Sequence, residues 1–245
     1  MIAMIERPSP NHDDRGGGAA IDMVVLHYTG MKTAAAALDR LCDPASRVSA
    51  HYVVDEDGTV YRLVDDGRRA WHAGVACWAG ATDINARSLG IEIVNPGHEF
   101  GYRPFPAVQT EAVARLTGDL VRRHGIDPRR VVGHADVAPS RKEDPGEFFD
   151  WARLARDGLG LWPAADFAVS PHAPELSPGM TGPAVLNLQI ALDAIGYRVE
   201  GTGLYDETLE LVVVAFQRHF RQRLFDGVAD AETVSLIHHL AERSG

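Results

Sequence analysis

The chain has 245 residues and 45% of them are hydrophobic, which is enough for one large domain or for a medium and a small one. Its formal net charge is −10 and it has no block of Lys and Arg, which argues against nucleic acids and anionic membrane surfaces as partners. No segment has the length and apolarity for membrane insertion, and the N-terminal residues lack a signal-peptide core. We therefore expect a cytoplasmic protein, with the periplasm as the alternative, and we expect a monomer.

Strand and helix patterns alternate through the first two thirds of the chain. Apolar runs predict strands at residues 21–30, 88–94 and 129–134, and helical spacing predicts helices at residues 34–43 and 109–124. Two alternating runs within residues 50–64 flank Asp57-Gly58, a strong signal for a β-hairpin. This order predicts an α/β or α+β domain, with a mixed central β-sheet flanked by helices.

The last third of the chain has a different pattern. Residues 166–178, rich in Pro, Ala and Ser, predict a linker between a first domain, residues 1–165, and a second, residues 179–245. Apolar residues recur at helical spacing in three stripes of the second domain: Val185, Leu188, Leu192 and Ile195; Leu209, Val212, Val213, Phe216 and Phe220; Leu236, Ile237 and Leu240. Asp206 and Asp230 stand where helix N-caps belong. We expect a small three-helix domain.

The segment "GHADVAPSRKEDPG", residues 133–146, gathers an imidazole, an ammonium and carboxylates in a short space. His134 ends one predicted strand, and His27 ends another. Together with Asp144 they supply two imidazoles and one carboxylate, a set that suits zinc and leaves its fourth position open for water. Ligands this far apart in the sequence are not specific by themselves. The alternative is a solvated turn before a helix.

Two further charged residues fit hydrolysis by such a metal. Glu92 lies mid-strand and points away from Ile91 and Ile93, where a carboxylate costs several kcal/mol unless it is paired, hydrogen-bonded, protonated or facing a polar cleft. It is either a general base for water whose pKa zinc lowers toward about 7, or a residue salt-bridged within the sheet. Lys142 either presents its ammonium near the oxyanion of a substrate carbonyl or is an ordinary surface lysine.

Sequence blocks in the first domain together resemble a known family. In order, they are "VVLHYTG", "SAHYVVDEDGTVYRLV", "AWHAG", "INARSLGIEIVN" and "VVGHADVAPSRKEDPG". They are similar to blocks of the zinc-dependent N-acetylmuramoyl-L-alanine amidases of the AmpD/AmiD type, which share a fold with peptidoglycan-recognition proteins and phage-type amidase lysozymes. The zinc ligands that this resemblance implies are His27, His134 and Asp144. It also implies that Glu92 is the catalytic glutamate and that Lys142 stabilises the transition state.

The same resemblance implies a substrate groove around four further residues: His51, Trp71, His72 and Asn85. Arg87 is an additional candidate, as the partner of a peptide carboxylate. Three of these residues have simpler alternatives. His51 starts a strand and is equally well a hydrogen-bonded structural histidine, and Trp71 is equally well part of the core. For Arg87, an ordinary surface arginine is the favoured interpretation.

The second domain resembles a peptidoglycan-binding domain of the three-helix type. The resemblance rests on "SPGMTGPAVLNLQIALDAIGY", "YDETLELVVVAFQRHF" and "DGVADAETVSLI", which are weaker motifs than those of the first domain. The alternative is a helical appendage that only packs on the catalytic domain.

Taken with the ligand set, the resemblance implies a zinc hydrolase of peptidoglycan. It would cleave the amide bond between N-acetylmuramic, or 1,6-anhydro-N-acetylmuramic, acid and L-Ala of the stem peptide, in cell-wall recycling or turnover. Its partners would be muropeptides or murein. The main alternative is a non-hydrolytic peptidoglycan-binding or sensing protein, against which the complete ligand set and Glu92 speak. A zinc peptidase or deacetylase with the same three ligands would cut a different bond.

Overall fold

A computed structural model describes residues 3–16 and 20–244. Residues 1–2, 17–19 and 245, which include the outer ends of both predicted domains, lie outside that description. The strands are β1 (Ile5–Glu6), β2 (His12–Asp14), β3 (Met23–Tyr28), β4 (Tyr52–Val54), β5 (Val60–Arg62), β6 (Arg68–Ala70), β7 (Ser88–Ile93) and β8 (Val131–Gly133). The helices are α1 (Ala34–Cys42), α2 (Ile84–Arg87), α3 (Gly97–Phe100), α4 (Ala107–His124), α5 (His134–Val137), α6 (Trp151–Arg156), α7 (Pro183–Ile195), α8 (Glu207–Phe220) and α9 (Ala231–Glu242), with 3₁₀ turns at Pro44–Ser46 and Pro128–Arg130.

The central sheet is mixed, as predicted. Its six strands have the order β1-β5-β4-β7-β3-β8, and β2 pairs with β6 in a separate two-stranded sheet. Strands β4 and β5 pair antiparallel and form the hairpin predicted around Asp57-Gly58. Strands β3, β7 and β8 run parallel. Because parallel strands end at the same edge of a sheet, residues at the carboxyl ends of these three strands are brought together.

The two faces of the sheet differ because side chains alternate along each strand. On one face, apolar residues of β3 and β7, among them Leu26, Ile91 and Ile93, share a core with α4. On the opposite face, His27 of β3 lies beside Glu92 of β7 in the parallel register. The prediction that Glu92 points away from Ile91 and Ile93 is therefore confirmed, and its side chain lines a pocket.

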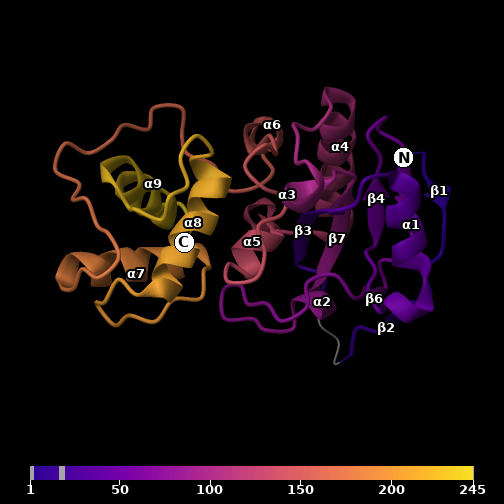
Figure 1. Cartoon of the computed structure of the whole chain (residues 1–245), viewed down its shortest axis with the longest axis horizontal. Helices are drawn as coiled ribbons and strands as arrows, with labels where there is room; N and C mark the ends of the chain where they lie inside the picture. Colours follow the sequence, from indigo (N-terminus) through magenta and orange to yellow (C-terminus); the bar gives the residue numbers. More distant parts are fainter. Residues whose placement is uncertain (1–2, 17–19, 245) are drawn as a thin grey trace.

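The C-terminal region forms the predicted three-helix domain from α7, α8 and α9. Asp206 and Asp230 are the expected N-caps, and their carboxylates accept backbone N–H groups of Leu209 and Thr233. In Figure 1, α5 lies between the sheet and the helices of this domain. Apolar residues of β3, α5, α7 and α8 belong to one hydrophobic cluster, so a continuous core joins the two parts of the chain.

The segment 166–178, predicted to be a linker, packs against the C-terminal helices. The N–H of Ser170 donates to Oγ of Ser235 over 3.0 Å. Leu176 is only 2% exposed and forms an isolated bridge with Ala229. The domain boundaries themselves stay a prediction. Among the helices of residues 3–16 and 20–244, none combines the length and the apolarity needed to cross a membrane.

Candidate active site

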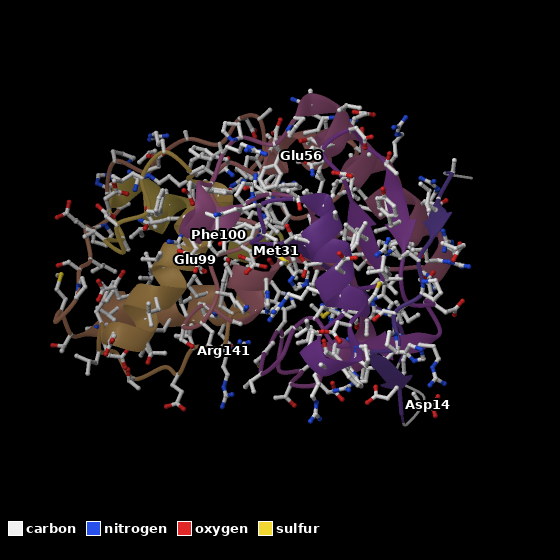
Figure 2. The ribbon with its side chains drawn as sticks, turned by 45° about the vertical axis from the view of Figure 1, so that its right-hand side comes forward. Asp14, Met31, Glu56, Glu99, Phe100 and Arg141 are labelled. Atoms are coloured by element: carbon white, nitrogen blue, oxygen red, sulfur yellow. The ribbon has the colours of Figure 1, made fainter. Side chains whose placement is uncertain are left out.

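A pocket of about 350 Å³ opens at the carboxyl edge of the parallel strands. Its lining brings together residues that the sequence spreads over the first domain, including Trp71, His72, Glu92, His134, Lys142 and Asp144. Figure 2 labels two further lining residues, Met31 near the middle of the molecule and Arg141 below it. Two of the three predicted metal ligands, His134 and Asp144, and both predicted catalytic residues therefore line one cavity, and the third ligand, His27, is buried against them.

Three buried ligand atoms converge at the base of this pocket. Nδ1 of His27 lies 2.9 Å from Nδ1 of His134, and Oδ2 of Asp144 lies 3.3 Å and 3.0 Å from these two nitrogens. Among the described residues, these three form the one group of at least three His, Cys, Asp or Glu side chains placed to hold a metal ion together. His27 is the next-to-last residue of β3, His134 follows β8, and Asp144 lies in the loop after α5.

A hydrogen-bond chain determines which nitrogen of His27 carries its proton. The Ser88 hydroxyl donates its only hydrogen to the carbonyl of Ile84 over 2.6 Å, so its oxygen must accept from Nε2–H of His72, 3.1 Å away. Nδ1 of a neutral His72 is then a lone pair, and it accepts from Nε2–H of His27 over 3.0 Å. The remaining nitrogen of His27, Nδ1, presents a lone pair to the ligand cluster.

The second histidine is fixed in the same tautomer by a backbone carbonyl. Nε2 of His134 lies 3.1 Å from the oxygen of Ala73, which can only accept, so Nε2 carries the proton and Nδ1 a lone pair. Two imidazole lone pairs and the Asp144 carboxylate thus face one another at hydrogen-bond distance with no proton between them. Such a set repels itself unless a cation lies between its members, so the residues fit a bound metal ion.

The electrostatics of the cluster favour the forms that bind metals. Burial, followed by the nearby His134, lowers the pKa of His27 to about 4, so its ring is neutral at neutral pH. Burial alone would raise the pKa of Asp144, but when an imidazole is protonated, the charge and hydrogen bonds of His134 and His27 outweigh burial and hold that pKa far below its ordinary value, so Asp144 is the ionised member of the cluster. A neutral imidazole and an ionised carboxylate are the ligand forms that a metal requires.

Glu92 and Lys142 face the same space. Burial and then the charge of Asp144 raise the pKa of Glu92 well above its ordinary value, while the charge of Lys142 acts in the opposite direction. Among the described residues, Oε2 of Glu92 has no hydrogen-bond partner. A carboxylate with a raised pKa and a free oxygen in a pocket is suited to accept and return a proton. Lys142 lies close enough for its charge to lower the pKa of His27 as well.

Comparison with known proteins matches both parts of the chain to known families. Residues 17–147 match the N-acetylmuramoyl-L-alanine amidase family, and residues 181–237 match a peptidoglycan binding domain. The chain belongs to this amidase family. It is 36% identical over 240 residues to N-acetylmuramoyl-L-alanine amidase AmiD of Escherichia coli, covering 92% of this chain and 84% of the relative. Family members hydrolyse the amide bond between muramic acid and L-alanine, and the match supports the same activity here.

Two solved structures extend the similarity to nearly the whole amidase. The complex of AmiD from Escherichia coli with anhydro-N-acetylmuramic acid-L-Ala-D-γ-Glu-L-Lys superposes with a TM-score of 0.79 at 35% identity, over 93% of this chain and 92% of that one. AmpDh3 of Pseudomonas aeruginosa with an anhydromuramic pentapeptide gives a TM-score of 0.78 at 30% identity, over 93% and 94%. Both domains and their arrangement are thus similar to those of these enzymes.

The residues predicted around the substrate groove of the amidase fall into two groups. Trp71 and His72 line the pocket. His51 does not: its Nδ1 accepts from the N–H of Gly90, and its Nε2 faces Arg15 and the carbonyl of Arg68.

The other two residues of the second group are also engaged within the fold. The side-chain oxygen of Asn85 accepts the backbone N–H groups of His72 and Ala73, and so holds the segment that carries His72. Arg87 pairs with Asp22. Neither Asn85 nor Arg87 lies in the lining of the pocket.

Two residues with clear roles at the site were missed in the sequence. Ser88 terminates the hydrogen-bond chain behind His27. Gly90 makes room for the ring of His72 in that chain, because a Cβ at Gly90 would lie 2.5 Å from Cγ of His72. The glycine carried a readable signal, because Gly inside a strand often marks a close approach of another group. Ser88 carried none, since its role depends on a ring contributed by a residue 16 positions earlier in the chain.

Proposed function

We propose that this amidase is a zinc enzyme that releases the stem peptide from N-acetylmuramic or 1,6-anhydro-N-acetylmuramic acid. The observation that carries the proposal is the convergence of three buried lone-pair donors, from His27, His134 and Asp144, beside Glu92 in one pocket. Ligands of a tetrahedral zinc, each about 2.1 Å from the ion, lie roughly 3.4 Å apart. The three donor atoms here are separated by 2.9 to 3.3 Å, which supports zinc.

In the proposed reaction, the ion supplies Lewis-acid chemistry by polarising the scissile carbonyl and by making water easier to deprotonate. Glu92 accepts the proton of the attacking water and then delivers it to the leaving amine of L-Ala. The ammonium of Lys142 stabilises the oxyanion that develops on the carbonyl. The raised pKa of Glu92 supports this role, because a carboxyl group that must hold and return a proton works best near the operating pH.

The substrate that we propose is a soluble anhydro-muropeptide, and the process is cell-wall recycling. The two similar enzymes described above were solved with anhydromuramic peptides, which supports this substrate class. A cytoplasmic site of action would fit recycling, whereas the peptidoglycan-binding domain would fit polymeric wall in the periplasm. A non-hydrolytic binding protein is the weaker alternative, because it would have no use for the free carboxylate of Glu92.

The test is mass spectrometry of the products from soluble anhydro-muropeptides and, separately, from intact sacculi. Release of free peptides that begin with L-Ala is expected, and treatment with a chelator should abolish it. The faster of the two substrates decides between recycling and wall remodelling. Cleavage at any other bond, or no cleavage at full zinc occupancy, would contradict the proposal.

A further inference from the structure

We propose that the C-terminal domain is a working part of the metal site, because three of its residues hold the segments that carry His134 and Asp144. These residues are Tyr197, Arg218 and His219, and we call them the interdomain clamp. The inference rests on the proposed function in that it takes the three-ligand cluster as the metal site. It assigns to this domain a role that wall binding does not require.

The first contact of the clamp is a buried carboxylate on α5. Asp136 is 2% exposed and lies on the same short helix as His134. Its Oδ1 accepts the hydroxyl of Tyr197 over 2.6 Å. Its Oδ2 accepts Nδ1–H of His219 over 2.8 Å and the N–H of Gly133 over 2.6 Å. Two side chains of the C-terminal domain therefore hold the helix that positions a metal ligand.

The ring of His219 is itself held in place by aromatic stacking. It lies between Trp151 of α6, at 3.7 Å and 18°, and Phe220, at 3.9 Å and 3° between ring planes. Trp151 in turn packs closely on Gly133, where an added Cβ would lie 3.3 Å from its ring. Since the imidazole cannot rotate freely, its Nδ1–H is directed at Asp136.

The second contact of the clamp acts on the loop that contains Asp144. Nη2 of Arg218 lies 3.0 Å from a carboxylate oxygen of Glu143, and its Nε lies 3.8 Å from one of Glu147. These two glutamates flank Asp144 on either side. The carbonyl of Asp144 also accepts the N–H of Ala135 over 2.8 Å, which links this loop to α5. The clamp thus engages both ligand-bearing segments from one surface.

A domain that served only as a tether would not need these contacts. Most surface ion pairs contribute little, but buried hydrogen bonds to a carboxylate are strong and geometrically specific. Groups that orient metal ligands typically change metal affinity by about 10- to 100-fold when they are lost. Loss of a clamp contact should therefore weaken zinc binding without removing any ligand.

The matched pair Tyr197→Phe and Tyr205→Phe tests this in the full-length protein. Both tyrosines are 1% exposed and each donates one hydrogen bond, Tyr197 to Asp136 and Tyr205 to the carbonyl of Gly227 within the C-terminal domain. Zinc affinity is measured by competition with a chromogenic chelator, alongside thermal unfolding and the visible spectrum of the cobalt-substituted protein. We expect Tyr197→Phe to weaken zinc binding by about fivefold and to shift the cobalt spectrum. Tyr205→Phe should leave both unchanged at a similar loss of stability.

A second pair tests the hydrogen bond of His219 and guards against a purely structural effect. His219→Leu removes the donor and should weaken zinc binding by about tenfold, whereas His219→Asn keeps an N–H near Nδ1 and should restore most of it. Equal zinc affinity within both pairs would overturn the clamp while leaving the zinc amidase intact. A wild-type protein that binds no zinc would overturn both proposals.

Discussion

Two buried clusters of histidine and carboxylate share the short helix α5, which carries His134 of one and Asp136 of the other, and they behave differently. In the metal cluster, His27 and His134 both present lone pairs to Asp144. In the cluster around Asp136, which two residues of the interdomain clamp contact, every close partner of the carboxylate donates a hydrogen: the Tyr197 hydroxyl, the Nδ1–H of His219 and a backbone N–H. The first cluster therefore needs a cation between its members, whereas the carboxylate of the second is satisfied by hydrogen-bond donors.

The difference teaches that a buried His–Asp contact is not by itself a metal site. The partner of the imidazole nitrogen that faces away from the carboxylate decides whether the nitrogen that faces the carboxylate carries a proton or a lone pair. Behind His27 stands an acceptor, Nδ1 of His72, and behind His134 stands a carbonyl, so both protons point away from Asp144. Among the described residues, Nε2 of His219 has no partner, which leaves its Nδ1 free to carry the proton toward Asp136. Substitutions in each cluster should separate these two cases.

The largest effect is expected from Asp144→Ala. It removes the charged ligand, so zinc affinity and turnover should both fall by about a thousandfold or more. Chelator competition and peptide release measure the two quantities. Zinc should raise the thermal stability of the wild type, and this gain should be absent in the variant. If the variant bound zinc with wild-type affinity, the cluster of His27, His134 and Asp144 would not be the metal site.

The next effect in size is expected from Glu92→Ala, which alters chemistry without altering the ligands. Turnover should fall by about 10²- to 10⁴-fold, because the proton of the attacking water loses its acceptor. Zinc content should remain at wild-type level, as measured by elemental analysis of the purified protein. Full activity in this variant would exclude Glu92 as the base.

A moderate effect is expected from Ser88→Ala, which removes the end of the chain behind His27. Without the hydroxyl, His72 can change tautomer, and zinc binding should weaken by about tenfold. The control is Ser235→Ala, because that hydroxyl also donates over 2.6 Å to the carbonyl four residues earlier and also accepts one hydrogen bond, but lies in α9. If the two variants bind zinc equally well, the tautomer chain has no influence on the metal.

The smallest effect is expected from Arg87→Ala. Arg87 forms a partly exposed ion pair with Asp22 and does not line the pocket, so KM for a muropeptide should stay within about twofold and stability should fall by about 1 kcal/mol. Steady-state kinetics and urea unfolding measure these values. A large rise in KM would restore Arg87 as a substrate contact.

Much of the fold was predictable because its signals are local. The apolar runs before His27 and His134, the turn at Asp57-Gly58 and the caps at Asp206 and Asp230 each depend on a few neighbouring residues, and all of them are confirmed. Short elements such as β1, β2, α2 and α5 were not predicted, because two to four residues carry too little periodicity to be read.

The sequence by itself indicated which residues we propose to carry the chemistry, since the ligand types, the glutamate and the lysine stand in recognisable blocks. The tertiary structure decided how they are used. It placed His51, Asn85 and Arg87 in hydrogen bonds and an ion pair away from the pocket, and it set Ser88 behind His72. It also joined α5 to the C-terminal domain. Tautomers, orphaned lone pairs and interdomain contacts depend on atoms from distant parts of the chain, and no local pattern records them.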